Sequence, residues 1–112
     1  MSSTWIGQAE RAAWQRRAAA ELAAILDAHD DLPLITWTVG PAGSVLVGRV
    51  SALFPAAQAR SVFTAWQKGL ALEEAREDQM SGGTTVLHAA ARGRGVTVRL
   101  TATVHDDEDG DL

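Results

Sequence analysis

Two runs of about nine residues flank Gly93 and Arg94, and this pattern constrains the fold more than any other part of the sequence. Glycine at the first central position of a two-residue loop is typical of a type II′ turn, whose twist matches paired strands. A hairpin in which Arg92 pairs with Gly95 gathers the apolar side chains on one face. These are Leu87, Ala89, Ala91, Val96, Val98, Leu100 and Ala102, and Thr85 lies on the same face opposite Ala102. The other face then carries Val86, His88, Arg99, Thr101 and Thr103 among its members.

A second hairpin is predicted around the segment Gly40–Gly43. Proline followed two residues later by glycine suits a type I turn closed by a left-handed glycine bulge. In that register Val39 lies opposite Val45 and Trp37 lies opposite Val47, so these four share a face with Ile35. The opposite face takes Leu34, Thr36, Thr38, Leu46, Gly48 and Val50.

Each hairpin follows a predicted helix. The first runs from Trp5 to about His29 after a Thr4 N-cap, and the second from Pro55 to about Ala75. Apolar residues recur at helical spacing in both. The stripes are Trp14, Ala18, Leu22, Ile25 and Leu26, and then Ala59, Val62, Phe63, Trp66 and Leu70. Residues 73–83 are polar and end in two glycines, which indicates a mobile loop.

The order helix, hairpin, helix, hairpin predicts an α+β fold. Two αββ units, about 1–53 and 54–104, form a four-stranded antiparallel sheet with both helices on one face. The domain therefore spans residues 1–104. Residues 105–112 hold five of the 14 acidic residues of the chain and no Lys or Arg, so we expect a disordered acidic tail.

Composition excludes several functions. The absence of cysteine excludes disulfides, thiolate metal sites and a cysteine nucleophile. The first residues lack the apolar segment of a signal peptide, and no stretch reaches the roughly 18 apolar residues of a membrane span. We therefore expect a cytoplasmic protein.

Three groups of residues could carry chemistry. His29 with Asp27, Asp30 and Asp31, and His105 with the acids of residues 106–109, have ligand types that bind hard cations. We interpret the His29 group as a solvated helix end and the His105 group as a solvated tail, so we predict no metal and no cofactor. His88 opposite Arg99, with Thr101 beside them, could orient a ligand. No carboxylate lies on that hairpin, so we predict no catalytic residue.

The hairpin tip offers a different chemistry. Arg92, Arg94 and Arg99 make a small basic finger that could contact phosphates, and the acidic tail could fold back to occupy it. The strands lack the aromatic residues of an RNA-binding sheet, and the net charge of the chain is −4.

Nearly the whole chain resembles small actinomycete proteins of unknown function. The resemblance lies in LPLITWTVGPAGSVLVGRV, FTAWQKGLALEE and SGGTTVLHAAARGRGVTVRLTATV. The resemblance implies a cytoplasmic protein from a high-GC bacterium, and the presence of nine arginines but one lysine is typical of such a genome. It assigns no role to any residue.

The sequence thus predicts a non-enzymatic interaction module that forms a homodimer through its open sheet face. The expected contact residues are His88, Arg99, Thr101, Val86 and Leu46, with Leu34 and Val50 as further apolar members of that face. The alternatives are a nucleic-acid-associated regulator that uses the arginine tip with an autoinhibitory tail, and a small-ligand or enzyme site around His88.

Overall fold

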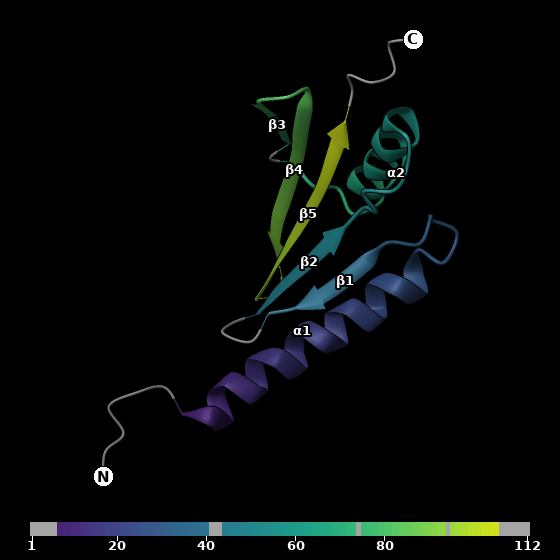
Figure 1. The fold of residues 1–112 in the computed structure, drawn as a ribbon. Helices are drawn as coiled ribbons and strands as arrows, with labels where there is room; N and C mark the ends of the chain where they lie inside the picture. The colour runs from purple at the N-terminus through teal and green to yellow at the C-terminus, as the bar shows by residue number, and fades with distance from the viewer. Residues whose placement is uncertain (1–6, 41–43, 74, 94, 106–112) are drawn as a thin grey trace.

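The computed structural model describes residues 7–40, 44–73, 75–93 and 95–105, arranged as two helices and one five-stranded sheet (Figure 1). The elements in chain order are α1 (Gln8–Ala28), β1 (Thr36–Val39), β2 (Val45–Arg49), α2 (Ala56–Gly69), β3 (Arg76–Met80), β4 (Thr84–Gly93) and β5 (Val96–His105). Of the predicted tail, residues 105–112, His105 is instead the last residue of β5, and residues 106–112 lie outside the described residues.

Both predicted helices are present, and their buried stripes are largely those expected. In α1, Ala18 and Ile25 are buried while Leu26 is 44% exposed. In α2 the four buried residues are Ala59, Val62, Phe63 and Trp66.

Helix α2 ends at Gly69, earlier than the predicted Ala75, because the chain turns into a left-handed residue at Ala71, with φ of 55°. The Ala71 amide donates to the Lys68 carbonyl and the Leu72 amide donates to the Gln67 carbonyl, at 3.1 and 3.0 Å. This is the hydrogen-bond pattern of a Schellman cap. The cap turns Leu72 into the core, where it is 5% exposed.

The α+β class is confirmed, but the four-stranded antiparallel sheet is wrong. The strand order is β1-β2-β5-β4-β3, and β2 pairs with β5 in parallel. Parallel strands need a long crossover connection, which here contains α2, β3 and β4. The two halves of the chain therefore do not repeat one αββ unit, since the second half contributes three strands.

Strand β3 replaces part of the predicted mobile loop. Its five residues, REDQM, are poor strand formers, but they pair antiparallel with β4 from Arg76↔His88 to Met80↔Thr84. Gly82 and Gly83 then turn the chain with φ values of 82° and 79°. The charged residues of β3 suit an outer strand, because they discourage pairing with another sheet.

The terminal hairpin has the predicted faces in a different register. Gly93 pairs with Val96, and Ala91 and Ala89 pair with Val98 and Leu100. Gly95, which directly precedes Val96, has φ of 75°. The difference from the predicted register is two residues along β5, and because side chains alternate with period two, every residue keeps its face.

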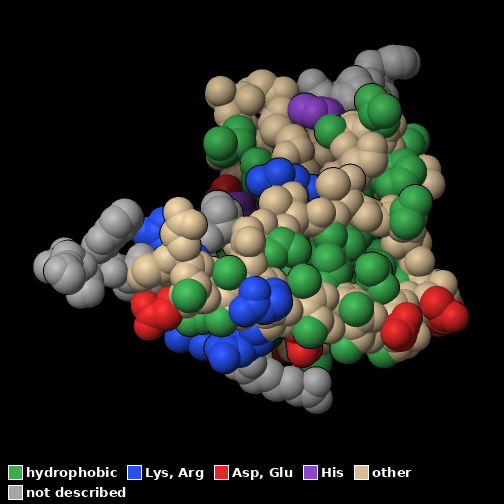
Figure 2. Space-filling model, turned by 90° about the horizontal axis from the view of Figure 1, so that it is seen from below, with side chains coloured by type: hydrophobic (Ala, Val, Ile, Leu, Met, Phe, Trp, Pro, Cys, Tyr) green, Lys and Arg blue, Asp and Glu red, His purple; other side chains and the backbone are tan. Residues whose placement is uncertain are grey.

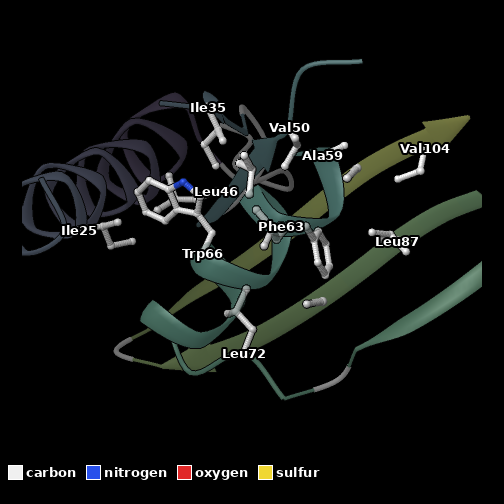
Figure 3. Close-up of a cluster of buried hydrophobic side chains, with 14 of the residues drawn as sticks. Ile25, Ile35, Leu46, Val50, Ala59, Phe63, Trp66, Leu72, Leu87 and Val104 are labelled. Atoms are coloured by element: carbon white, nitrogen blue, oxygen red, sulfur yellow. The ribbon is translucent and has the colours of Figure 1, made fainter. Parts of the chain in front are cut away.

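The first hairpin differs by one residue, and this difference exchanges the two faces of β2. Val39 pairs with Leu46 and Trp37 with Gly48. Leu46 is therefore 0% exposed and points into the core, as Figure 3 shows, instead of lying on the open face. Val50 is buried in the same cluster. Val45 and Val47 take the places on the open face that the sequence analysis gave to Leu46 and Gly48.

Gly48 explains why this register is favoured. A Cβ atom at Gly48 would lie 2.9 Å from Cδ1 of Ile35 and 3.0 Å from the Trp37 ring. The missing side chain lets Trp37 lie against the sheet and make an edge-to-face contact with Trp66, at 5.6 Å between ring centroids. Trp66 in turn donates from its indole nitrogen to the Pro33 carbonyl, at 2.6 Å. This contact fixes α2 to the segment that leads into β1.

We predict that Gly48→Ala destabilises the protein by about 1 to 3 kcal/mol, because the added methyl group overpacks the site under Trp37. Gly93→Ala is the matched control, since a Cβ there meets nothing within 4 Å and its φ is not positive. It should be neutral or stabilising by up to about 1 kcal/mol. Urea unfolding of both variants checks this, and equal midpoints would contradict the packing described.

The register of β2 has its own test. Leu46→Ala should cost about 2 to 5 kcal/mol because it opens a cavity in the core, whereas Val47→Ala should cost less than about 1.5 kcal/mol because Val47 is only half-buried on the open face. Thermal and chemical unfolding of the two variants measures how much unfolding free energy each one loses. A larger loss at Val47 than at Leu46 would favour the bulged register.

Candidate functional site: a basic open sheet face

The open face is the side of the sheet that the two helices leave uncovered. All the buried hydrophobic residues of the sheet project from the other side, into one cluster with α1 and α2. The open face presents arginines from four neighbouring strands, and these are Arg49 on β2, Arg99 on β5, Arg92 on β4 and Arg76 on β3. All four are exposed.

The pairing registers place these residues relative to one another. Arg49 pairs with Thr101, Thr101 with His88, and His88 with Arg76, so the four residues form one row across four strands. Arg99 lies two residues before Thr101 on β5, beside Val47 and Ala90 in the next row. Arg92 pairs with Thr97 in the row after that.

A hollow of about 970 Å³ lies on this face. Seven of its 13 lining residues are basic or Thr, namely Arg49, Arg76, His88, Arg92, Thr97, Arg99 and Thr101, and the other six are four alanines, Val47 and Leu100. Among the described residues the open face carries one carboxylate, Asp78, which follows from the alternation along each strand. Four guanidinium groups against one carboxylate leave an excess of three positive charges before any contribution from His88.

Asp78 is already engaged on this face. Its carboxylate lies 3.2 Å from Nε2 of His88 and 3.6 Å from Nε of Arg76. By contrast, no carboxylate of the described residues lies within ion-pair distance of Arg49, Arg92 or Arg99. These three arginines are therefore the cations that an incoming anion can neutralise.

One other side of the molecule is mixed in character. The underside of the molecule shows basic, acidic and hydrophobic side chains together (Figure 2). Helix α1 alternates Glu10, Arg11, Arg16, Arg17 and Glu21 along its length. The concentration of one sign of charge on the open face is thus a local property of the sheet in a chain whose net charge is −4.

The structure places most of the predicted contact residues together. Val86, His88, Arg99 and Thr101 all lie on the open face, and His88 pairs directly with Thr101. Leu46 does not, because it is buried on the opposite side. Leu34 is 90% exposed but precedes β1, while Val50 belongs to the core. Arg92 joins the basic face, and Arg94 lies outside the described residues.

Three members of the face were missed from the sequence. The predicted hairpin gives Arg49 no face, and the sequence predicts a loop at Arg76 and Asp78 because the charged run REDQM gives little sign of a strand. Asp78 supplies a carboxylate beside His88 that the terminal hairpin alone does not contain. The His88 side chain is 36% exposed and the Asp78 side chain 48%, so water screens the interaction between them.

The other candidate groups do not assemble a metal site within the part of the chain that the structure describes. No cluster of three or more His, Asp or Glu side chains is found there. His29 instead makes an edge contact with Trp66 at 6.2 Å, and His105 lies 3.2 Å from the Thr84 hydroxyl. The acids of residues 106–109 fall outside the described ranges.

Comparison of the chain with protein-family models, with curated proteins and with solved structures finds no match in any of the three. Within the described ranges, neither helix combines the length and the apolar character that crossing a bilayer requires.

Proposed function

We propose that the protein is a non-enzymatic binding module whose open sheet face holds an anionic partner. The observation that carries the proposal is the convergence of Arg49, Arg99, Arg92 and Arg76 from four strands onto one hollowed surface, where the described residues place a single carboxylate. A surface of one charge sign attracts the opposite charge, raises the rate of association and disfavours partners of like charge.

The same observation argues against a second copy as the partner on this face. In a symmetric dimer each patch meets its own copy, so arginines of one chain would face arginines of the other. Leu46 and Val50, which the sequence predicts as apolar contact residues of the dimer, are buried in the core. An anionic partner therefore suits the face better than a homodimer does.

An enzyme site around His88 has less support. The His88 imidazole contacts the Asp78 carboxylate through Nε2, but both are substantially exposed. A general base works best in a site where burial and neighbours tune its protonation. Binding an anion through charge requires only exposed cations, and the arginines of the open face provide them.

The proposal is tested with inorganic polyphosphate as the probe, added to the full chain at low salt. We expect Arg49→Gln combined with Arg99→Gln to weaken binding at least tenfold, because two unpaired cations are lost. Asp78→Asn should tighten binding about two- to fivefold, because it removes the carboxylate on the face.

The matched control is Arg11→Gln combined with Arg16→Gln, which makes the same change of net charge on exposed residues of α1. It should alter the affinity by less than about twofold, because these side chains lie off the open face. Equal losses in the two double variants would mean that net charge alone governs binding. Equal losses, or no binding by the wild-type protein at low salt, would reject the proposed function.

A further inference from the structure

Arg49, Arg99 and Arg92, which form no ion pair with a described carboxylate, lie on a straight diagonal across the sheet. Arg49 is level with Thr101, Arg99 lies two residues before Thr101, and Arg92 is level with Thr97, two residues before Arg99. Each step therefore crosses one strand and moves two residues along. With strands about 4.8 Å apart and a rise of about 3.3 Å per residue, each step is about 8 Å and the diagonal about 16 Å long.

A regular line of cations selects a regular line of anions. A compact anion such as a single phosphate would be held by groups that converge on one point, whereas these arginines are spread over three strands. A rigid polymer with evenly spaced charges can contact all three at once, and the long arginine side chains adjust the exact spacing.

On this basis we propose that the open face binds the phosphate backbone of double-stranded nucleic acid, with one strand of the duplex lying along the Arg49, Arg99 and Arg92 diagonal. The inference rests on the proposed function and names the class of its partner. Guanidinium groups form paired hydrogen bonds to phosphate oxygens. Thr97 and Thr101, which flank Arg99 on β5, add hydroxyl donors of the kind that contact phosphates.

An acidic peptide fits the diagonal less well. Peptides bind sheets by extending an open edge, or they insert apolar side chains into a groove. The diagonal crosses β2, β5 and β4, and at Arg49 and Arg99 the backbone is paired with strands on both sides. β4 pairs with β3 only up to His88, so a peptide that extended the remaining edge of β4 would run beside Arg92 and not along the diagonal. The residues beside the arginines on this face are small or polar apart from Val45 and Val47, so a peptide would find few apolar anchors.

The face also indicates how the nucleic acid is contacted. No Phe, Tyr or Trp of the described residues projects from it, since Trp37 belongs to the core side, and His88 is the one ring on the face. Flexible single strands are usually held by stacking of their bases on aromatic rings. A duplex needs no such platform, because its backbone is already ordered. Contacts to phosphates carry no sequence information, so binding should be independent of base sequence.

The experiment uses the full chain and two fluorescently labelled 16-base-pair DNA duplexes of unrelated sequence, with anisotropy read from 50 to 200 mM salt. Three phosphate contacts predict a slope of about −2.7 in a plot of log affinity against log salt, and a loss of about fortyfold over this range. The two duplexes should bind equally. Each of Arg49→Gln, Arg99→Gln and Arg92→Gln should reduce the slope by about 1.

Arg16→Gln on α1 is the control and should leave the slope unchanged. Each of the four substituted arginines is exposed, so we expect the variants to keep the fold. Thermal unfolding of each variant checks this. Unchanged slopes in the three diagonal variants, or a loss as large in Arg16→Gln, would overturn the inference.

Further probes separate this inference from the proposed function. If polyglutamate or a single-stranded oligonucleotide of equal charge binds as tightly as the duplex, the partner class is wrong while the anion-binding face stands. If polyphosphate binds through the face and the duplex does not, the inference fails alone. If neither binds, both fail.

Discussion

The parallel pairing of β2 with β5 is the contact on which both faces of the sheet depend. On the core side it places Leu46 beside Val98 and Gly48 beside Leu100. On the open side it places Arg49 beside Thr101, one row from Arg99. Because alternate residues of each strand point to opposite faces, one register determines the buried core and the charged surface together. The basic face is therefore a consequence of the same pairing that buries the apolar residues.

That pairing is secured from the helix side. A parallel pair requires the chain to cross from one strand end back to the other, and here α2 covers the sheet during the crossing. Trp66 holds α2 in place through its hydrogen bond to Pro33 and its contact with Trp37, and Gly48 makes room for the Trp37 ring. The core in Figure 3 thus joins residues of both halves of the chain around one tryptophan.

The sequence predicted those features that depend on local periodicity. The buried stripe of α2 follows from helical spacing. The predicted register of β4 with β5 is wrong by two residues, but the predicted faces are right because side chains alternate with period two. For β2 the predicted register is wrong by one residue, and the faces of its residues are therefore wrong as well. Strand β3 was missed because REDQM lacks strand propensity and is stabilised by pairing with β4. For the site, His88, Arg92, Arg99 and Thr101 were found on one hairpin, whereas Arg49 and Arg76 join them only through non-local pairing, which periodicity cannot indicate.

The most direct test of the central pairing is a nuclear Overhauser spectrum of the isotopically labelled protein. We predict backbone cross-peaks between Val47 and Arg99 and between Arg49 and Thr101, together with side-chain cross-peaks from Leu46 to Val98. Cross-peaks that place Val47 opposite Trp37 and Val45 opposite Val39, with none between β2 and β5, would contradict both the fold and the basic face built on it.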